Sequence, residues 1–370
     1  MRYYLVAGEA SGDLHGSNLM RAILAKDPDA QFRFWGGDLM QAAGGTLVSH
    51  YKNRAFMGLW EVISNLRTIA RFLEQAKKDI RQWNPDALIL IDNPGFNMRL
   101  ARFASELSIP VHYYIAPKVW AWNTGRVKGI KKYVSHLYSI LPFEPAFFSK
   151  FQVPVDYVGN PVLDAISAYS ATPRWKEQMG IEKPIIALLP GSRRHEIAGT
   201  LPLMASLQTR FKEYQFVVAA APGYNRDRIN QMAGTPVMVV ENDTYNVLAH
   251  ASAAMVASGT ATLETAIFNV PQLVCYRVSP ITWWIGKKVI KVKWVSLVNL
   301  ILGRELVREL LQHNFNQANC ESELRSLLAG PRRNEVLNGY RELNGLLGKP
   351  GASENAAELM VSRIKNLHLN

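Results

Sequence analysis

Residues 185–196 read IIALLPGSRRHE, and this stretch decides the fold. An apolar run typical of a buried strand breaks at Gly191 and Ser192, and Arg193 and Arg194 follow where a helix is expected to begin. A strand that leads through such a turn into a helix N-terminus presents free backbone N–H groups and a favourable dipole, so it suits an anion. Arginines at a helix N-terminus are unfavourable unless an anion compensates them, and their planar donors suit phosphate. The stretch therefore favours phosphate binding, with Arg194 either assisting Arg193 or facing solvent.

The same strand, turn and helix pattern recurs along the chain. Short apolar runs separated by helical patterns predict parallel sheets built from βαβ units. A chain of 370 residues suffices for two domains. We expect an α/β fold with two Rossmann-like domains facing across a cleft, one spanning 1–165 and the other 166–345, with the C-terminal tail of about 346–370 able to pack back on the first. The expected strands are residues 3–8, 32–36, 87–91, 111–115, 185–189, 216–220, 236–240, 253–257 and 272–276.

The charge and the cysteine content of the chain limit the classes of function that it can have. The chain carries 42 basic and 30 acidic residues, a net charge of +12, and the excess occurs in both halves. This charge fits phosphorylated substrates, an anionic membrane surface or nucleic acid. The two cysteines, Cys275 and Cys320, form no CxxC pair, so neither a zinc site nor a disulfide framework is expected. The chain starts directly in an expected strand and has no apolar window of about 18 residues, so we expect a cytoplasmic protein without a spanning helix.

A second stretch, residues 257–264 (ASGTATLE), extends the anion site. Ser258, Gly259 and Thr260 offer N–H and hydroxyl donors, and Glu264, one turn into the helix, can accept from a ribose diol. Combined with the turn at 191–194, these residues predict a nucleoside diphosphate site. The sole DxD lies in a polar turn at 27–29, so we expect no metal and no separate cofactor. Arginine and helix N-termini must then neutralise a leaving diphosphate.

Three motifs of the first domain are candidates for an acceptor site. Asp92 in IDNPGFN follows a predicted strand and either acts as a general base or caps the next helix. The loop APKVWAW carries Trp120 and Trp122, which either pack on sugar or lipid or belong to the core. The turn GEASGD is either a ligand loop or a plain tight turn, since it lacks the spacing of a dinucleotide motif. Its candidate residues are Gly8, Glu9, Ser11, Gly12 and Asp13.

Two segments have the pattern of a membrane-contacting surface. In residues 59–73 apolar side chains recur at helical spacing, which also fits a core helix. Residues 281–294, ITWWIGKKVIKVKW, mix tryptophan with lysine, as interfacial helices do, or form a solvated face over a core helix. The candidate membrane contacts are Leu59, Val62, Leu66, Ile69, Trp283, Trp284, Lys287, Lys288 and Lys291.

The motifs together resemble those of the lipid-A-disaccharide synthase family, which are inverting glycosyltransferases of the GT-B fold. The likeness rests on LVAGEASGD, IDNPGFN, APKVWAW, LPFE, VGNP, LLPGSR, ASGTATLE and VSLVNLILGRELVRELLQ, which occur in family order from residue 5 to about residue 312. Where the family often reads IDAPDFN, this chain reads IDNPGFN, which leaves Asp92 as the sole acid at that strand end.

The resemblance implies a reaction of bacterial lipid A and lipopolysaccharide biosynthesis. A 2,3-diacylglucosamine passes from UDP-2,3-diacylglucosamine to the 6-hydroxyl of 2,3-diacylglucosamine 1-phosphate (lipid X), giving the β-1,6 disaccharide and UDP without a metal. It assigns Asp92 as the general base, Arg193 as the diphosphate contact, Glu264 as the ribose contact and Asn299 as a further site residue. It also implies peripheral association with the inner face of the inner membrane, and leaves open whether two copies form a homodimer.

Two other classes of function remain as alternatives. A different GT-B transferase or a UDP-sugar epimerase would keep the phosphate turn and Glu264 but would need no membrane surface. A basic nucleotide- or RNA-binding module would show steep salt dependence and no turnover. We expect no nucleic-acid partner, because the basic residues interleave with tryptophans rather than forming an RNA-binding motif.

Overall fold

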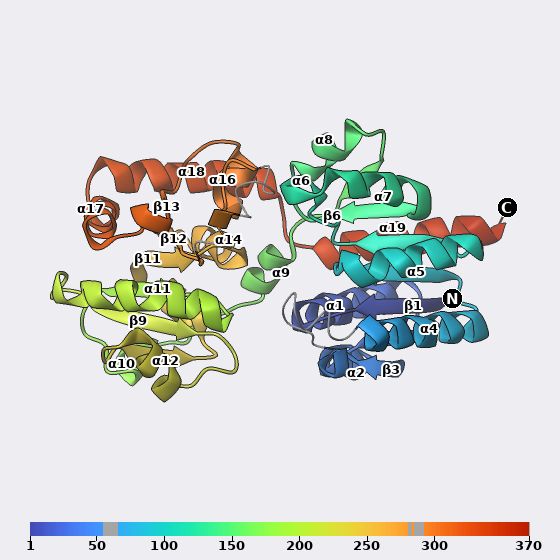
Figure 1. The fold of residues 1–370 in the computed structure, drawn as a ribbon, viewed down its shortest axis with the longest axis horizontal. Coiled ribbons are helices and arrows are strands. Elements are labelled where there is room, and N and C mark those ends of the chain that lie inside the picture. The colour runs from blue at the N-terminus through green and yellow to red at the C-terminus, as the bar shows by residue number, and fades with distance from the viewer. Residues whose placement is uncertain (55–65, 280–282, 285–291, 370) are drawn as a thin grey trace. The chain divides into compact units, whose positions relative to one another are not determined.

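The computed structural model describes residues 1–54, 66–279, 283–284 and 292–369. The chain divides into two compact units (Figure 1). Unit 1 contains Met1–Pro161 and Lys349–Asn370, so the C-terminal tail belongs to the same unit as the N-terminus. Unit 2 contains Val162–Gly348.

Unit 1 is a seven-stranded parallel sheet between two layers of helices. Alternate residues of the first strand, β1 (Arg2–Ala7), pack into the hydrophobic cores on opposite faces of the sheet. Tyr3 and Leu5 pack against the helices α1 (Ala10–Lys26) and α19 (Ala352–Leu369) on one face. Tyr4 and Val6 pack against α4 (Leu66–Trp83), α5 (Pro94–Glu106) and α7 (Val127–Tyr133) on the other face. This period of two, with both faces buried, is what a covered parallel sheet requires. The sheet order is β3-β2-β1-β4-β5-β6-β7, and the elements are β1 (Arg2–Ala7), α1 (Ala10–Lys26), β2 (Gln31–Gly36), α2 (Asp38–Ala43), β3 (Thr46–His50), η1 (Tyr51–Arg54), α4 (Leu66–Trp83), β4 (Ala87–Ile91), α5 (Pro94–Glu106), β5 (Val111–Tyr114), α6 (Val119–Trp122), η2 (Thr124–Arg126), α7 (Val127–Tyr133), β6 (His136–Ser139), α8 (Glu144–Ser149), β7 (Val155–Tyr157) and α19 (Ala352–Leu369).

Unit 2 repeats the plan with a six-stranded parallel sheet. Its central strand β8 is buried along its whole length. The order is β10-β9-β8-β11-β12-β13, and the elements, starting with the helix that leads into it, are α9 (Pro161–Ser167), α10 (Trp175–Gln178), β8 (Ile185–Leu189), α11 (Arg194–Ser206), η3 (Leu207–Thr209), β9 (Gln215–Ala220), α12 (Arg226–Ala233), β10 (Met238–Glu241), α13 (Thr244–Ala249), β11 (Ala251–Ala257), α14 (Thr260–Ile267), β12 (Gln272–Tyr276), α16 (Leu297–Leu302), β13 (Glu309–Leu311), η4 (Gln312–Asn314), α17 (Gln317–Leu328) and α18 (Pro331–Leu347).

The predicted fold class is confirmed: both sheets are parallel and their strands alternate with helices. In each sheet the strand order reverses beside the first strand, between β1 and β4 in unit 1 and between β8 and β11 in unit 2. Ligands of open parallel sheets bind outside the carboxyl ends of the strands at such a point. The turns after these four strands are GEASGD, IDNPGFN, PGSRR and SGTATLE, so each pair of predicted motifs lies at the switch point of its own sheet.

Candidate active site

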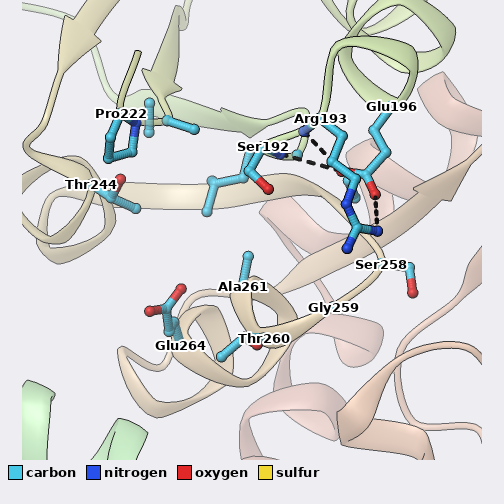
Figure 2. A pocket seen from close by; sticks show the side chains of 15 residues that line it. Ser192, Arg193, Glu196, Pro222, Thr244, Ser258, Gly259, Thr260, Ala261 and Glu264 are labelled. Atoms are coloured by element: carbon cyan, nitrogen blue, oxygen red, sulfur yellow. Dashed lines mark hydrogen bonds and ion pairs between the residues drawn. The ribbon is translucent and has the colours of Figure 1, made fainter. Parts of the chain in front are cut away.

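A cavity of about 410 Å³ lies at the switch point of unit 2 (Figure 2). The ends of β8, β9 and β11 form its base, and the turns that lead into α11 and α14 form two of its walls. Figure 2 shows Arg193 and Glu264 on opposite walls of the cavity. The lining consists of Leu189, Gly191, Ser192, Arg193, Glu196, Ala219, Ala221, Pro222, Thr244, Ala257, Ser258, Gly259, Thr260, Ala261 and Glu264.

The turn after β8 is shaped by Gly191 and closed by Glu196. Gly191 has a φ of +103°, and a Cβ there would lie 2.7 Å from the Glu196 carboxylate, so only glycine fits. Glu196 accepts from the backbone N–H groups of Ser192 and Arg193, at 3.3 and 3.2 Å, and pairs with the Arg193 guanidinium at 3.5 Å. An anion at this turn therefore competes with Glu196. Arg194 is exposed and does not line the cavity, so Arg193 is the arginine at this wall.

The opposite wall places a carboxylate beside a tyrosine. Gly259 has a φ of +129°, and the Ser258 hydroxyl donates to the Val295 carbonyl at 2.9 Å, which ties the turn to the segment before α16. Glu264 accepts from the Tyr245 hydroxyl at 3.2 Å. Burial raises the pKa of Glu264, and the bond from Tyr245 partly opposes that rise. The wall thus offers backbone and hydroxyl donors at one end and a carboxylate oxygen at the other.

The switch point of unit 1 brings together charged groups from three loops. Asp92 directly follows β4, and Gly8 follows β1. A Cβ on Gly8 would lie 2.1 Å from the side-chain amide nitrogen of Asn93, so the two turns pack closely against each other. Burial raises the pKa of Asp92; the positive charge of Lys118 opposes this, and the negative charge of Glu9 adds to it. The neutral form of Asp92 is favoured by burial, which makes its carboxylate a stronger base than a solvated one.

The model of the lipid-A-disaccharide synthetase family matches residues 3–358. The chain belongs to this family. The lipid-A-disaccharide synthase of Myxococcus xanthus (strain DK1622) is 39% identical over 367 residues, which cover 96% of this chain and 96% of that protein. The enzyme of the same name from Syntrophus aciditrophicus (strain SB) is 38% identical, covering 98% of this chain and 97% of that one. The chain is therefore a glycosyltransferase.

Solved structures of low sequence identity share the fold. The UDP-GlcNAc 2-epimerase of Neisseria meningitidis bound to UDP-GlcNAc matches with a TM-score of 0.66 at 13% identity, over 99% of this chain and all of that one. A glycotransferase of kitacinnamycin matches with a TM-score of 0.64 at 14% identity, over 98% of each chain. These likenesses establish the GT-B fold of this family member and nothing about its substrate.

Two of the candidate residues from GEASGD, Asp13 and Gly12, are buried and are not exposed as residues of an open ligand loop would be. Asp13 is buried and accepts from the backbone N–H groups of Gly37, Leu39 and Met40 at 2.7 to 3.0 Å. Its carboxylate therefore caps α2, as in the plain tight turn that the sequence also allowed. Gly12 is buried, and a Cβ there would make a tight contact of 3.2 Å with the Ala7 Cβ.

Of the remaining acceptor candidates, several are accessible. Glu9 and Ser11 are exposed, and the Ser11 hydroxyl donates to Glu9 at 3.0 Å. Trp122 is 44% exposed, with the Arg126 guanidinium 4.8 Å from its ring centre. Trp120 is instead a core residue of this glycosyltransferase: it is buried, and its indole N–H donates to Glu144 at 2.9 Å.

Asn299 does not reach the cavity either. Its side chain is fully buried, donates to the Val307 carbonyl and Glu309, and accepts from the backbone of Leu306 and Val307, all within 3.0 Å. These bonds use every polar position of the amide. In this structure Asn299 holds the segment that follows α16 and is not a cavity residue.

The membrane candidates are only partly covered by the structure. Leu59, Val62, Lys287, Lys288 and Lys291 lie outside the described residues. Leu66 is the first residue of α4, and Ile69 and Trp283 are partly buried. Trp284 is 61% exposed, the largest exposed fraction of any large apolar side chain among the described residues. Within that same part of the chain, no helix is long and apolar enough to cross a membrane.

Proposed function

We propose that this chain transfers 2,3-diacylglucosamine from UDP-2,3-diacylglucosamine to the 6-hydroxyl of 2,3-diacylglucosamine 1-phosphate (lipid X), forming the β-1,6 disaccharide 1-phosphate and UDP. The observation that carries the proposal is the full-length family match combined with a cavity lined by the two motifs that suit a nucleoside diphosphate. No feature of the described cavity favours an epimerase over a transferase, so the family relationship decides between them.

Unit 2 is proposed to bind the donor. The guanidinium of Arg193 and the N-termini of α11 and α14 face the diphosphate, and the Glu264 carboxylate accepts from the ribose hydroxyls. When the glycosidic bond to UDP breaks, negative charge develops on the β-phosphate. Fixed donors that face this charge lower the barrier, because they are already oriented before the reaction. We propose that these groups, and no metal ion, neutralise the leaving group.

Asp92 is proposed to be the general base of unit 1. Its carboxylate removes the proton of the acceptor 6-hydroxyl while that oxygen attacks the anomeric carbon from the face opposite UDP, which inverts the configuration. A base must be ionised to act, so activity is expected to fall as the pH drops through the raised pKa of Asp92. The acceptor phosphate is proposed to lie at the start of α1, near Ser11.

The test measures UDP release from mixtures of both substrates. Wild type should release UDP only when donor and acceptor are both present. Asp92→Asn should lower kcat by roughly 10²- to 10⁴-fold while the Kd for UDP stays within about twofold, since Asp92 belongs to the other unit. Asp29→Asn, which changes an exposed aspartate of a surface turn, is the control and should keep full activity. Undiminished turnover of Asp92→Asn would exclude the base.

We also propose that the protein associates peripherally with the inner face of the bacterial inner membrane. One observation supports this: the exposed Trp284 lies in a basic, tryptophan-containing stretch of a chain with a net charge of +12. The substrates proposed above are acylated lipids, which a membrane-bound enzyme can reach. Tryptophan at an interface and lysine near anionic lipid each favour such binding.

A further inference from the structure

The backbone of Asp92 has an unusual conformation for an L-residue. Asp92 has a φ of +44°, and Asn93, the next residue, has a φ of +45°. The left-handed region is unfavourable for residues that carry a Cβ, although aspartate and asparagine tolerate it best. Two consecutive residues in this region persist only where surrounding groups hold them there, and such sites cluster at active centres.

Two buried side chains hold this conformation through a single atom, the carbonyl oxygen of Asp92. The Tyr113 hydroxyl donates to it at 2.5 Å, and the Asn97 side-chain N–H donates to it at 2.8 Å. Tyr113 comes from the neighbouring strand β5, and Asn97 comes from the first turn of α5. Both side chains are fully buried, whereas Asp92 itself is only partly buried.

The surrounding backbone restricts the same residue further. The Asp92 N–H donates to the Tyr114 carbonyl at 3.2 Å, and the Asn97 side chain also reaches the Ile91 carbonyl at 3.1 Å. The turn after β1 packs closely against the side chain of Asn93, since a Cβ on Gly8 would lie 2.1 Å from its amide nitrogen. When both the N–H and the carbonyl of a residue are fixed, the direction of its Cα–Cβ bond is fixed as well. The base of the Asp92 side chain is therefore held in place, and only rotation about its two side-chain torsions can move the carboxylate.

We infer that Tyr113 and Asn97 are positioning residues, which orient the Asp92 carboxylate toward the acceptor hydroxyl by binding the Asp92 carbonyl oxygen. This inference rests on the proposed role of Asp92 as general base. Neither side chain touches substrate in this account. Their contribution is geometric, and the rate of a proton transfer depends steeply on such geometry.

The test uses Tyr113→Phe, which removes one oxygen atom and retains the ring. Loss of a hydrogen bond that holds the strained residue is expected to lower kcat about tenfold, whereas the KM of both substrates and the Kd of UDP stay within about twofold. Tyr114→Phe is the matched control. Tyr114 is the next residue of β5, equally buried, and its hydroxyl lies 3.5 Å from Ser353, away from Asp92; its removal should leave kcat within twofold.

The pH dependence of kcat/KM is a second readout, which distinguishes a misplaced Asp92 side chain from a loss of folded protein. The charges that act on Asp92 are Lys118, after β5, and Glu9, after β1, and both remain in the variant. A released Asp92 side chain becomes more solvated, so the acidic limb of kcat/KM should move to lower pH in Tyr113→Phe. Partial unfolding would lower the whole profile without moving that limb.

Combining Tyr113→Phe with Asp92→Asn completes the test. If Tyr113 acts through Asp92, the double variant should be no slower than Asp92→Asn alone. Tyr113→Phe with wild-type kcat, or an equal loss in both backgrounds, would overturn the inference while leaving the base assignment intact. Wild-type turnover of Asp92→Asn would instead remove the proposed function on which the inference rests.

Discussion

The buried Glu144 provides a prediction that joins stability to pH. Glu144 is the first residue of α8 and is 1% exposed; it accepts from the Trp120 indole N–H at 2.9 Å and from the Leu141 N–H at 3.2 Å. Burial raises its pKa to about 7, because these two bonds and the charge of Lys118 only partly offset the loss of solvent. Glutamate is seldom buried to this extent unless it is paired, and among the residues that the structure describes no cation forms an ion pair with it.

The magnitude follows from the difference between the folded and unfolded states. A pKa of about 7 in the folded state against an ordinary 4.5 corresponds to roughly 3 kcal/mol, at about 1.36 kcal/mol per pH unit. Between these two values the folded state holds a proton that the unfolded state has released, so stability decreases as the pH rises. Below pH 4.5 the effect is absent, and above pH 7 it is complete.

Glu144→Gln removes this titration. The amide keeps an acceptor for Trp120 but presents an N–H to Leu141, which costs about 1–3 kcal/mol at every pH. The variant is therefore expected to be less stable than wild type at pH 5 and to recover roughly 2–3 kcal/mol relative to it by pH 8. Urea unfolding of both proteins at several pH values measures this difference.

The control is Glu106→Gln, since Glu106 is exposed and pairs with Arg102 of its own helix. That substitution should change the free energy of unfolding by less than about 0.5 kcal/mol throughout. If the difference between wild type and Glu144→Gln stayed constant within about 1 kcal/mol from pH 5 to pH 8, the buried-acid reasoning would be refuted.

Three further predictions concern the ligands. Arg193→Ala should weaken UDP binding roughly 10- to 100-fold in calorimetry, because a charge-assisted hydrogen bond is lost. Arg194→Ala should have little effect on UDP binding. Equal losses in the two variants would contradict the finding that Arg193 lines the cavity and Arg194 does not. Ser11→Ala should raise the KM of the acceptor and leave the Kd of UDP unchanged, and an unaltered acceptor KM would argue against phosphate at α1. Combining Lys287→Glu with Lys291→Glu should reduce binding to anionic vesicles, with neutral vesicles as the control; unchanged sedimentation with anionic vesicles would count against a membrane role for this stretch.

The fold could be predicted largely because its central strands are apolar and buried on both faces. The strands that were not predicted are β3, β6, β7 and β13, which lie at or next to the sheet edges. Edge strands bury less surface, so their sequences carry a weaker apolar signal: every residue of β3 and β7 is at least partly exposed.

The candidate site was predictable only where a motif is local in sequence. Gly191, Arg193, Ser258 and Glu264 belong to strand–turn–helix junctions, and the structure gathers them around one cavity. Partners from distant segments had no such signal. Tyr245 meets Glu264 across 19 residues, and Tyr113 meets Asp92 across 21.

Residue type alone also cannot reveal whether a polar side chain already forms hydrogen bonds within the protein. Asp13 and Asn299 belong to motifs that suit ligand binding, yet their hydrogen-bonding positions are used by neighbouring backbone. Glu196 shows the converse. The sequence motif assigned it no role, yet its carboxylate accepts hydrogen bonds from the backbone of the predicted anion-binding turn. These outcomes depend on which backbone groups the tertiary fold brings within hydrogen-bond distance.

The most direct test of the central claim is the identity of the product. Purified protein would be incubated with UDP-2,3-diacylglucosamine and 2,3-diacylglucosamine 1-phosphate, and the lipid product would be analysed by mass spectrometry and by NMR of the anomeric proton. The proposed mechanism predicts a tetraacyl disaccharide 1-phosphate with a β-1,6 linkage, formed together with UDP. An epimerised or hydrolysed donor sugar, with the acceptor unchanged, would contradict it.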